Sequence, residues 1–340
     1  MRILQIMAGA EFGGAEAFFV RLVLGLQRAG LDQRAVIRSH PRRAEALKGG
    51  GIEPVQLAFG GRFDLATPRA LKKIVKEYRP HIVLTWMNRA TRMCPKGDFV
   101  HVARLGGYYD LKYYKACDHL IGNTEDIVGY LVAEGWPEEK AHYLPNFVGE
   151  EQAGPLARNT FYTPDRAPLI LALGRLHENK AFDVLLDAVS RLPDAYLWLA
   201  GEGPLRRELE GLAEKLGIKP RVRFLGWRED IPALFATCDL FVCPSRLEPL
   251  GNVVVEAWAQ GVPVVATDSL GPGTLIEDGE TGILAPVDDA PALARAMALV
   301  LDDETLRSHI ARQGREVFED HFTEAVVTDT YRDFFEGLLP

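Results

Sequence analysis

The sequence predicts an α/β protein made of two doubly wound, parallel-sheet domains in tandem, with a cleft between them. The chain has 340 residues, about twice the size of a common domain. Short apolar runs alternate with amphipathic stretches along the chain, which is the order that builds parallel sheets. This alternation stops between Pro145 and Pro168 and then starts again, so we expect two similar domains.

The first domain is expected over residues 1–150. An apolar run at residues 3–6 predicts its first strand, and the stretch after it has helical spacing and ends at Gly30. Later strands are predicted at residues 35–38, 55–57, 81–85, 99–103 and 119–122.

Residues 151–166 are rich in proline, glycine and polar residues, and we interpret them as a linker. The second domain is expected over residues 167–322, with strands at 169–173, 196–200, 222–225, 240–243 and 262–266. Helices are predicted between these strands, at about 181–191, 204–216, 229–236 and 251–260. Residues 290–337 are predicted to be helical throughout, and the helix within 323–340 is expected to pack back on the first domain.

Composition excludes several classes of protein. Hydrophobic residues make up 47% and charged residues 25%, so the chain can bury a core and is not disordered. It contains no apolar run of the roughly 18 residues that a membrane span needs, and its start does not resemble a signal peptide. The four cysteines form no zinc pattern, so we interpret them as reduced thiols of a cytoplasmic protein.

The charge is unevenly distributed along the chain. The net charge is -8, yet residues 1–160 carry 22 basic and 17 acidic residues, a net of +5, and the remainder carries -13. This basic excess suggests an anionic partner, although solvated helix faces would carry the same charges. We expect no nucleic-acid partner, because the basic stretch contains no recognisable nucleic-acid module.

A pair of glycines, Gly13 and Gly14, follows the first predicted strand and precedes a helix. Such a turn lets a backbone approach a ligand, and the amides of the helix start favour a phosphate. An ordinary turn before a helix would look the same. The motif is not a GxGxxG fingerprint, so a nicotinamide cofactor is not supported.

Two further patterns carry chemistry in the second domain. Arg175 and Lys180 lie on a loop between a strand and a helix, where they can converge on one anion or serve as ordinary surface charges. Glu248 lies on another such loop, and Glu256 is about 1.5 turns into the helix that starts near Gly251. Two carboxylates in one cleft can bind sugar hydroxyls, while the amides at the helix start can meet a phosphate.

As an ordered set, these motifs resemble a known family. The set comprises GGAE near the start, GRxxxxK, AGEGP, the FLG of residues 224–226, and two glutamates eight apart followed by AWAQGVPVVATD. It is similar to the GT-B family of retaining, nucleotide-sugar-dependent glycosyltransferases, of the glycosyltransferase group 1 type (family four). The similarity is dense over about 168–290 and thinner over 1–150.

The resemblance implies a GT-B fold and a role for each matching residue. Arg175 and Lys180 match the pair that neutralises the donor diphosphate. Glu256 matches the residue that holds the ribose hydroxyls, and Glu248 the one beside the donor sugar. Three other stretches match regions of the family that contact the donor. Gly13 and Gly14 match the loop near the diphosphate, and Gly226 and Trp227 match the region near the base. Leu250, Gly251 and Asn252 match the stretch whose backbone amides reach the sugar and the phosphate.

The resemblance also implies retention of the anomeric configuration, for which a same-face substitution assisted by the leaving phosphate is the default mechanism. The donor is expected to be a UDP- or GDP-linked sugar. Placed cations stabilise a departing diphosphate, and the chain contains no Asp-x-Asp metal motif, so we expect a metal-independent enzyme without a cofactor.

One position departs from the family pattern. Where many relatives carry a histidine, this chain has Arg104, which could supply an electrostatic role near the donor sugar and is counted with Arg175, Lys180 and Glu248 as catalytic. The nearest histidine, His101, is expected to lie inside a strand as a core residue.

The acceptor is expected to bind the first domain. Residues 86–97 and 103–115 combine tryptophan and tyrosine with arginine and lysine, which suits an anionic glycan or glycolipid of bacterial envelope polysaccharide or lipopolysaccharide. The same residues suit peripheral contact with the cytoplasmic face of a membrane, and they would also suit ordinary loops. A nucleotide-sugar epimerase of related fold and a non-catalytic sugar-nucleotide-binding protein remain alternatives.

Overall fold

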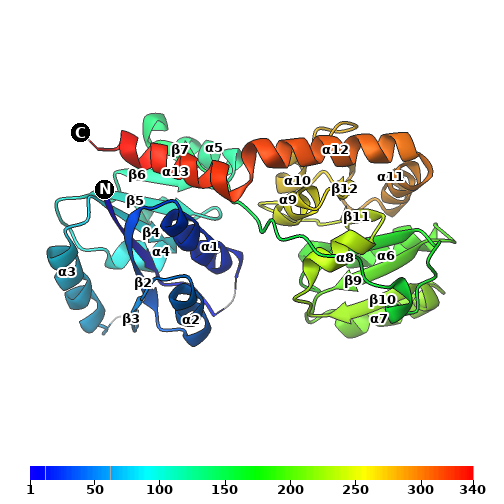
Figure 1. Ribbon diagram of the computed structural model, residues 1–340, viewed down its shortest axis with the longest axis horizontal. Helices are drawn as coiled ribbons and strands as arrows, with labels where there is room; N and C mark the ends of the chain where they lie inside the picture. The colour runs from blue at the N-terminus through cyan, green and yellow to red at the C-terminus, as the bar shows by residue number, and fades with distance from the viewer. Residues whose placement is uncertain (12, 62, 340) are drawn as a thin grey trace. The chain divides into compact units, whose positions relative to one another are not determined.

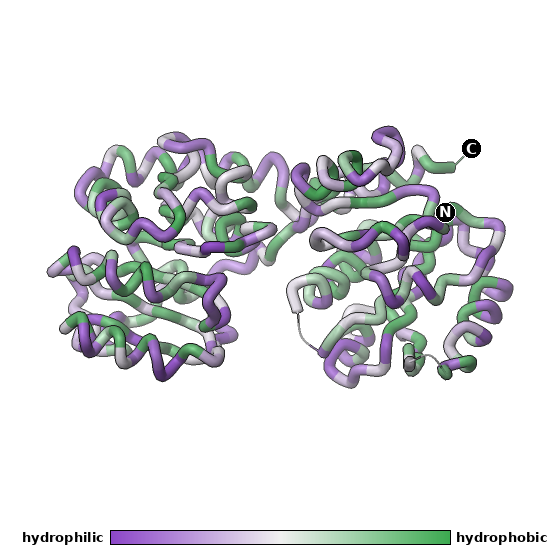
Figure 2. Tube along the Cα trace, turned by 180° about the vertical axis from the view of Figure 1, so that it is seen from behind, coloured by the Kyte–Doolittle hydropathy of each residue, from purple (hydrophilic) through white to green (hydrophobic). Residues whose placement is uncertain are grey.

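The computed structural model describes residues 1–11, 13–61 and 63–339, which form two compact units (Figure 1). Unit 1 comprises Met1–Phe147 together with the C-terminal residues from Glu324, and unit 2 comprises Val148–Thr323. Each unit is a parallel sheet with helices on both faces, which confirms the predicted fold class. The helices of both units alternate between hydrophobic and hydrophilic along their length, as amphipathic helices on a sheet do (Figure 2).

Within its described residues, unit 1 contains a seven-stranded sheet in the order β3-β2-β1-β4-β5-β6-β7. Its strands are β1 (Arg2–Met7), β2 (Asp32–Arg38), β3 (Val55–Leu57), β4 (Ile82–Trp86), β5 (Val100–Leu105), β6 (His119–Gly122) and β7 (Ala141–Tyr143). Side chains alternate between the two faces, so Ile3 and Met7 enter one core, whereas Leu4 and Ile6 enter the other.

The helices of unit 1 cover both faces of this sheet. They are α1 (Gly14–Arg28), α2 (Pro41–Gly49), α3 (Ala66–Tyr78), α4 (Met87–Met93), α5 (Glu125–Ala133) and α13 (Glu324–Gly337). Residues of α1, α2 and α13 share the core with Ile3, while residues of α3 and α4 share the core with Leu4. The last helix of the chain therefore completes the core of the unit that the first strand begins.

In the described residues of unit 2, the sheet has six strands in the order β10-β9-β8-β11-β12-β13. The strands are β8 (Leu169–Leu173), β9 (Tyr196–Ala200), β10 (Val222–Gly226), β11 (Leu240–Cys243), β12 (Val264–Thr267) and β13 (Ile283–Ala285). The helices are α6 (Phe182–Ser190), α7 (Arg206–Lys215), α8 (Ile231–Thr237), α9 (Asn252–Ala259), α10 (Leu270–Leu275), α11 (Ala290–Asp302) and α12 (Glu304–His321). Residues of α6, α7 and α11 fill the core on one face, and those of α8, α9 and α12 fill the core on the other.

In each sheet the first three strands are added toward one edge, and the later strands are added toward the other edge. In unit 1 the order reverses between β1 and β4, and in unit 2 between β8 and β11. Loops that leave the carboxyl ends of such a pair diverge to opposite faces of the sheet, which opens a crevice where ligands of doubly wound proteins bind. A ligand-binding site is therefore expected at the loops after β1, β4, β8 and β11.

The predicted strands are all present, but the two edge strands β7 and β13 and the helix α10 were not predicted. Residues 151–166 lie within unit 2. There Arg158 forms an ion pair with Asp239, and Trp198 donates its ring N–H to the Thr163 hydroxyl over 2.9 Å. This segment is therefore fastened to the sheet of unit 2.

Candidate functional site

Lys180 and Glu248 meet at the point of unit 2 where the strand order reverses. Lys180 ends a 3-10 turn over Glu178–Lys180 after β8, and Glu248 lies on the loop after β11. The Lys180 ammonium forms a hydrogen-bonded ion pair with Oε2 of Glu248, and both side chains are mostly buried. The structure thus brings together two predicted site residues that are 68 positions apart.

Backbone hydrogen bonds hold these two loops against each other. The Asn179 carbonyl accepts hydrogen bonds from the amides of Arg246 and Leu247, at 2.8 and 3.2 Å. The Arg246 guanidinium donates to both carboxylate oxygens of Asp183, at 2.9 and 2.6 Å, and also pairs with Asp288. This arginine was not among the predicted site residues, although it stands two positions before Glu248.

The helix α9 starts beside Glu248. Gly251 caps it in a left-handed conformation, with φ 68° and ψ 23°, which favours glycine. The amide of Gly271, at the start of α10, donates to the Glu248 carbonyl over 2.7 Å. A side chain at Gly271 would press against the backbone of residues 248–251, so this second glycine also shapes the loop. The first amides of α9 have no acceptor inside the helix and form a positively polarised end.

The remaining predicted residues of unit 2 take different positions. Arg175 is exposed, and within the described part of the chain its side chain forms no hydrogen bond or ion pair. Trp227, directly after β10, is 76% exposed. Gly226 ends β10 and its carbonyl accepts from the Gly201 amide over 2.8 Å. Glu256 is half-buried one turn after Asn252 on α9.

The glycine loop of unit 1 is organised by a buried carboxylate. Glu16, in the first turn of α1, is 8% exposed, and its Oε1 accepts a hydrogen bond from the Ala10 amide over 2.6 Å. A side chain on Gly9 or Gly13 would overlap this carboxylate, whereas the space around Gly14 is open. The GGAE motif therefore fixes a loop through its glutamate, a role that the sequence did not indicate.

Arg104, which was predicted as a catalytic residue, is buried inside unit 1. It is only 2% exposed, and its guanidinium lies over the rings of Phe18 and Trp86, 4.6 and 4.8 Å from their centroids. It donates to the Tyr331 hydroxyl over 2.8 Å and to Asn146. Stacking and neutral acceptors hold this charge inside the core of unit 1.

His101 is 6% exposed, as expected of a core residue, and its ring contacts the Thr85 hydroxyl at 3.0 Å. Burial lowers its pKa, so the neutral imidazole is favoured.

The two segments predicted to bind an acceptor are partly structural. Trp86 and Tyr114 are buried in cores of unit 1. Arg89, Arg92 and Lys96 are exposed, and the Arg92 guanidinium lies over the Tyr113 ring. The exposed part of these segments is thus mainly cationic.

No three histidine, cysteine or acidic side chains among the described residues gather so that they could hold a metal ion. None of the helices that the structure describes is long and apolar enough to cross a membrane.

Comparison with known proteins identifies two family matches. Residues 157–317 match the family described as "Glycosyl transferases group 1", and residues 12–152 match "Glycosyltransferase Family 4". Together these regions contain every site residue predicted from the sequence. The chain is 38% identical to the lipopolysaccharide core biosynthesis glycosyltransferase LpsE of Rhizobium meliloti, over 97% of this chain and 98% of the relative.

Solved structures share the whole fold at low identity. A glycosyltransferase from Rickettsia africae superposes with a TM-score of 0.89 at 19% identity, covering 99% of this chain and 98% of the other. Anabaena Alr3699/HepE, solved in complex with UDP, gives 0.86 at 19% identity, covering 99% and 100%. Together with the two parallel-sheet units, these similarities confirm the GT-B fold.

Proposed function

The chain belongs to the group 1 family of glycosyltransferases, and from this membership we propose that it transfers a sugar from a nucleotide-diphosphate sugar to a glycan or glycolipid of the bacterial envelope. We propose the lipopolysaccharide core as the acceptor, because the Rhizobium meliloti relative carries that activity in its name and matches nearly the whole chain. The reaction takes place on the cytoplasmic side, with peripheral rather than integral membrane contact.

The Lys180–Glu248 pair supports the donor half of this proposal. A nucleoside diphosphate gains negative charge as it leaves, and a preorganised cation stabilises that charge without reorganising. Lys180 is held in place by Glu248, while the exposed Arg175 has a guanidinium available for the diphosphate. The backbone of Leu250, Gly251 and Asn252 leads into α9, whose start adds a positively polarised helix end beside Glu248.

We propose the other donor contacts on the same basis, and the family match supports them. Glu256 binds the ribose hydroxyls, Gly226 and Trp227 hold the base, and Glu248 lies beside the donor sugar. Gly13 and Gly14 approach the diphosphate. UDP is the nucleotide we propose first, since the Anabaena structure contains it.

We propose that transfer is metal-independent, because two cations and a helix N-terminus can supply the charge for which other sugar transferases use a metal. The configuration at the anomeric carbon is retained by a same-face substitution, in which the leaving phosphate takes the proton of the acceptor hydroxyl. An NMR spectrum of the product tests this proposal, since an inverted anomer would contradict it. Transfer rates that fall after EDTA and recover with Mg²⁺ would contradict metal independence.

A nucleotide-binding experiment tests the donor site. The wild-type protein should show a saturable thermal shift with UDP or GDP, with and without EDTA. Removing Arg175 or Lys180 deletes a charge-assisted contact worth about 1.5–3 kcal/mol, so the Arg175→Ala and Lys180→Ala variants should bind about 10–100-fold more weakly. The Lys180→Ala variant should also slow transfer by about 10²–10³-fold.

The control is Arg207→Ala, which removes another exposed arginine of unit 2 without touching the switch point. It should bind nucleotide like the wild type. If no nucleotide shifts the wild-type protein, or if all three variants behave alike, the donor site is assigned to the wrong residues.

A further inference from the structure

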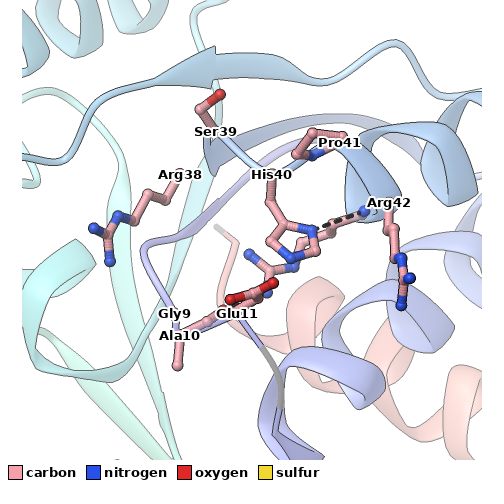
Figure 3. A pocket seen from close by; sticks show the side chains of 9 residues that line it. Gly9, Ala10, Glu11, Arg38, Ser39, His40, Pro41 and Arg42 are labelled. Atoms are coloured by element: carbon pink, nitrogen blue, oxygen red, sulfur yellow. Dashed lines mark hydrogen bonds between the residues drawn. The ribbon is translucent and has the colours of Figure 1, made fainter.

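A pocket of about 640 Å³ lies within unit 1, at the carboxyl ends of β1 and β2 (Figure 3). Ala10 and Glu11 line it from the loop after β1, and Arg38, His40, Arg42 and Arg43 line it from the end of β2 and the start of α2. The donor residues of unit 2 are not part of it. Its volume is that of a pocket for a small molecule such as a sugar phosphate.

The lining is strongly cationic. Three arginines face one carboxylate, that of Glu11, among the lining residues. Arg38 is exposed, and its guanidinium makes no hydrogen bond or ion pair with any residue that the structure describes. Figure 3 shows Arg38 and Arg42 extending on either side of His40. In this view the Glu11 carboxylate lies between the two arginines, so positive charge flanks the pocket on two sides of one carboxylate.

Arg43 adds a buried donor with an unused N–H group. It is 5% exposed, and its Nη2 donates to the Ala10 carbonyl over 2.7 Å. Its Nη1 is buried and has no hydrogen-bond partner among the described residues. An unsatisfied buried donor is unfavourable, and an anionic oxygen that reached Nη1 would satisfy it.

The start of α2 reinforces this potential. His40 caps the helix, and its Nδ1 accepts a hydrogen bond from the Arg43 amide over 3.1 Å. Pro41 takes the first helical position, and the first turn contains no acidic residue. The nine-residue helix therefore presents its positive end to the pocket, and its own first turn supplies no carboxylate; the carboxylate of the lining is that of Glu11.

We propose that this pocket binds a phosphate group carried by a sugar of the acceptor, held by Arg38, Arg42 and the start of α2. This inference rests on the proposed transfer to an envelope glycan and names the chemistry that selects its acceptor. A phosphate suits the site because arginine forks match its oxygens in pairs. The pocket adjoins the loop of Gly13, so an acceptor fixed here reaches the glycine loop of the same unit.

Calorimetric titration with glucose 6-phosphate, inorganic phosphate and glucose tests the proposal. The wild-type protein should bind glucose 6-phosphate in a saturable, salt-sensitive way, more tightly than inorganic phosphate, and should not bind glucose measurably. The exposed arginines are the residues to change, because the buried Arg43 supports the fold. The Arg38→Gln/Arg42→Gln double variant should lose at least tenfold in affinity for glucose 6-phosphate.

The matched control is Arg69→Gln, an exposed arginine on α3 outside the lining, which should bind like the wild type. Equal affinity in the double variant and the wild type would overturn the proposal, as would the absence of saturable binding. Inorganic phosphate that binds as tightly as the sugar phosphate would assign the pocket to a free anion instead. UDP binding is measured in parallel to distinguish failure of the pocket from failure of the donor site. A protein that binds glucose 6-phosphate but not UDP would contradict the donor site and not the pocket.

Discussion

Arg104 illustrates how the surroundings of a single residue decide its role. Its charge is surrounded by the faces of Phe18 and Trp86, and its donors reach Asn146 and the Tyr331 hydroxyl. The second of these partners is 227 positions away in the sequence. No local pattern around Arg104 could reveal that burial, because its partner Tyr331 comes from the last helix of the chain.

We predict that Arg104→Leu lowers the free energy of unfolding by about 2–4 kcal/mol, because it removes the buried hydrogen bonds that Arg104 donates to Asn146 and to the Tyr331 hydroxyl. Denaturant unfolding followed by fluorescence measures this loss. UDP binding at unit 2 should not change. A variant with wild-type stability but without transfer activity would instead support the predicted catalytic role of Arg104.

Gly201 provides a second test at the residue scale. Its φ is 147°, and a side chain there would overlap the Gly174 carbonyl where the loops after β8 and β9 approach. Gly201→Ala should therefore destabilise unit 2 by more than about 2 kcal/mol. The matched control is Gly211→Ala on α7, where space is open and alanine should stabilise the helix by about 0.5–1 kcal/mol. Equal melting temperatures for the two variants would contradict this view of the loop.

At the residue scale, the sequence predicted site residues where each one lies on a loop directly after a predicted strand. Lys180 and Glu248 each follow a predicted strand, and the topology of a doubly wound sheet brings such loops together. Arg246 and Glu16 were missed because their roles consist of contacts with loops whose course is set by tertiary structure.

At the scale of elements, short apolar strands flanked by helices were predictable because each is buried on both sides. The exceptions have physical causes. β7 and β13 are edge strands of only three residues, a length at which a period is hard to recognise even though β3, equally short, was predicted. The helix α10 contains two glycines and a proline in six residues. These elements exist because of their neighbours in the fold, which a local pattern does not record.

The junction of β6, β7 and α13 predicts a dependence on pH. The rings of His119 and His142 contact each other at 2.9 Å, and Phe334 of α13 packs against both. Burial lowers the pKa of both histidines below the ordinary 6.5, with Lys140 adding to the effect at His119 and Asp118 opposing it. The folded unit therefore binds fewer protons than the unfolded chain just below pH 6.5.

Stability from these histidines is present above pH 6.5 and is lost as the pH falls through their folded pKa values. We predict that the unfolding temperature of unit 1 decreases between pH 7.5 and 5.5, and that it decreases less in His142→Asn. Calorimetry at several pH values measures both slopes. His101 contributes equally to both proteins, so the difference between them isolates the pair, and identical slopes would contradict its role.

At the scale of the whole molecule, both units use the same strand order around a central reversal, extended by one edge strand in unit 1. The restart of the strand pattern after Pro168 made this repetition visible in the sequence. What the pattern did not record is how residues 151–166 lie against the sheet of unit 2, because Arg158 and Thr163 act through partners far along the chain.

The chain's final helix belongs to the core of the first unit, and this gives a test of the division into units. Val327, Tyr331 and Phe335 of α13 are fully buried in that core. At about 1.5–3 kcal/mol for each large apolar side chain, their removal costs an amount comparable to the total stability of many domains. Truncation after Thr323 should therefore unfold or strongly destabilise unit 1 while unit 2 retains its own core.

Calorimetry with and without UDP separates the two units in this truncated protein. The unfolding transition whose temperature UDP raises should persist, because the proposed nucleotide site lies in unit 2. The other transition should disappear or shift to a much lower temperature. A control truncation after Gly337, which keeps α13, should change the first unit far less. If both transitions fall together when α13 is removed, the units unfold as one cooperative body, and the core that α13 completes is not independent of unit 2.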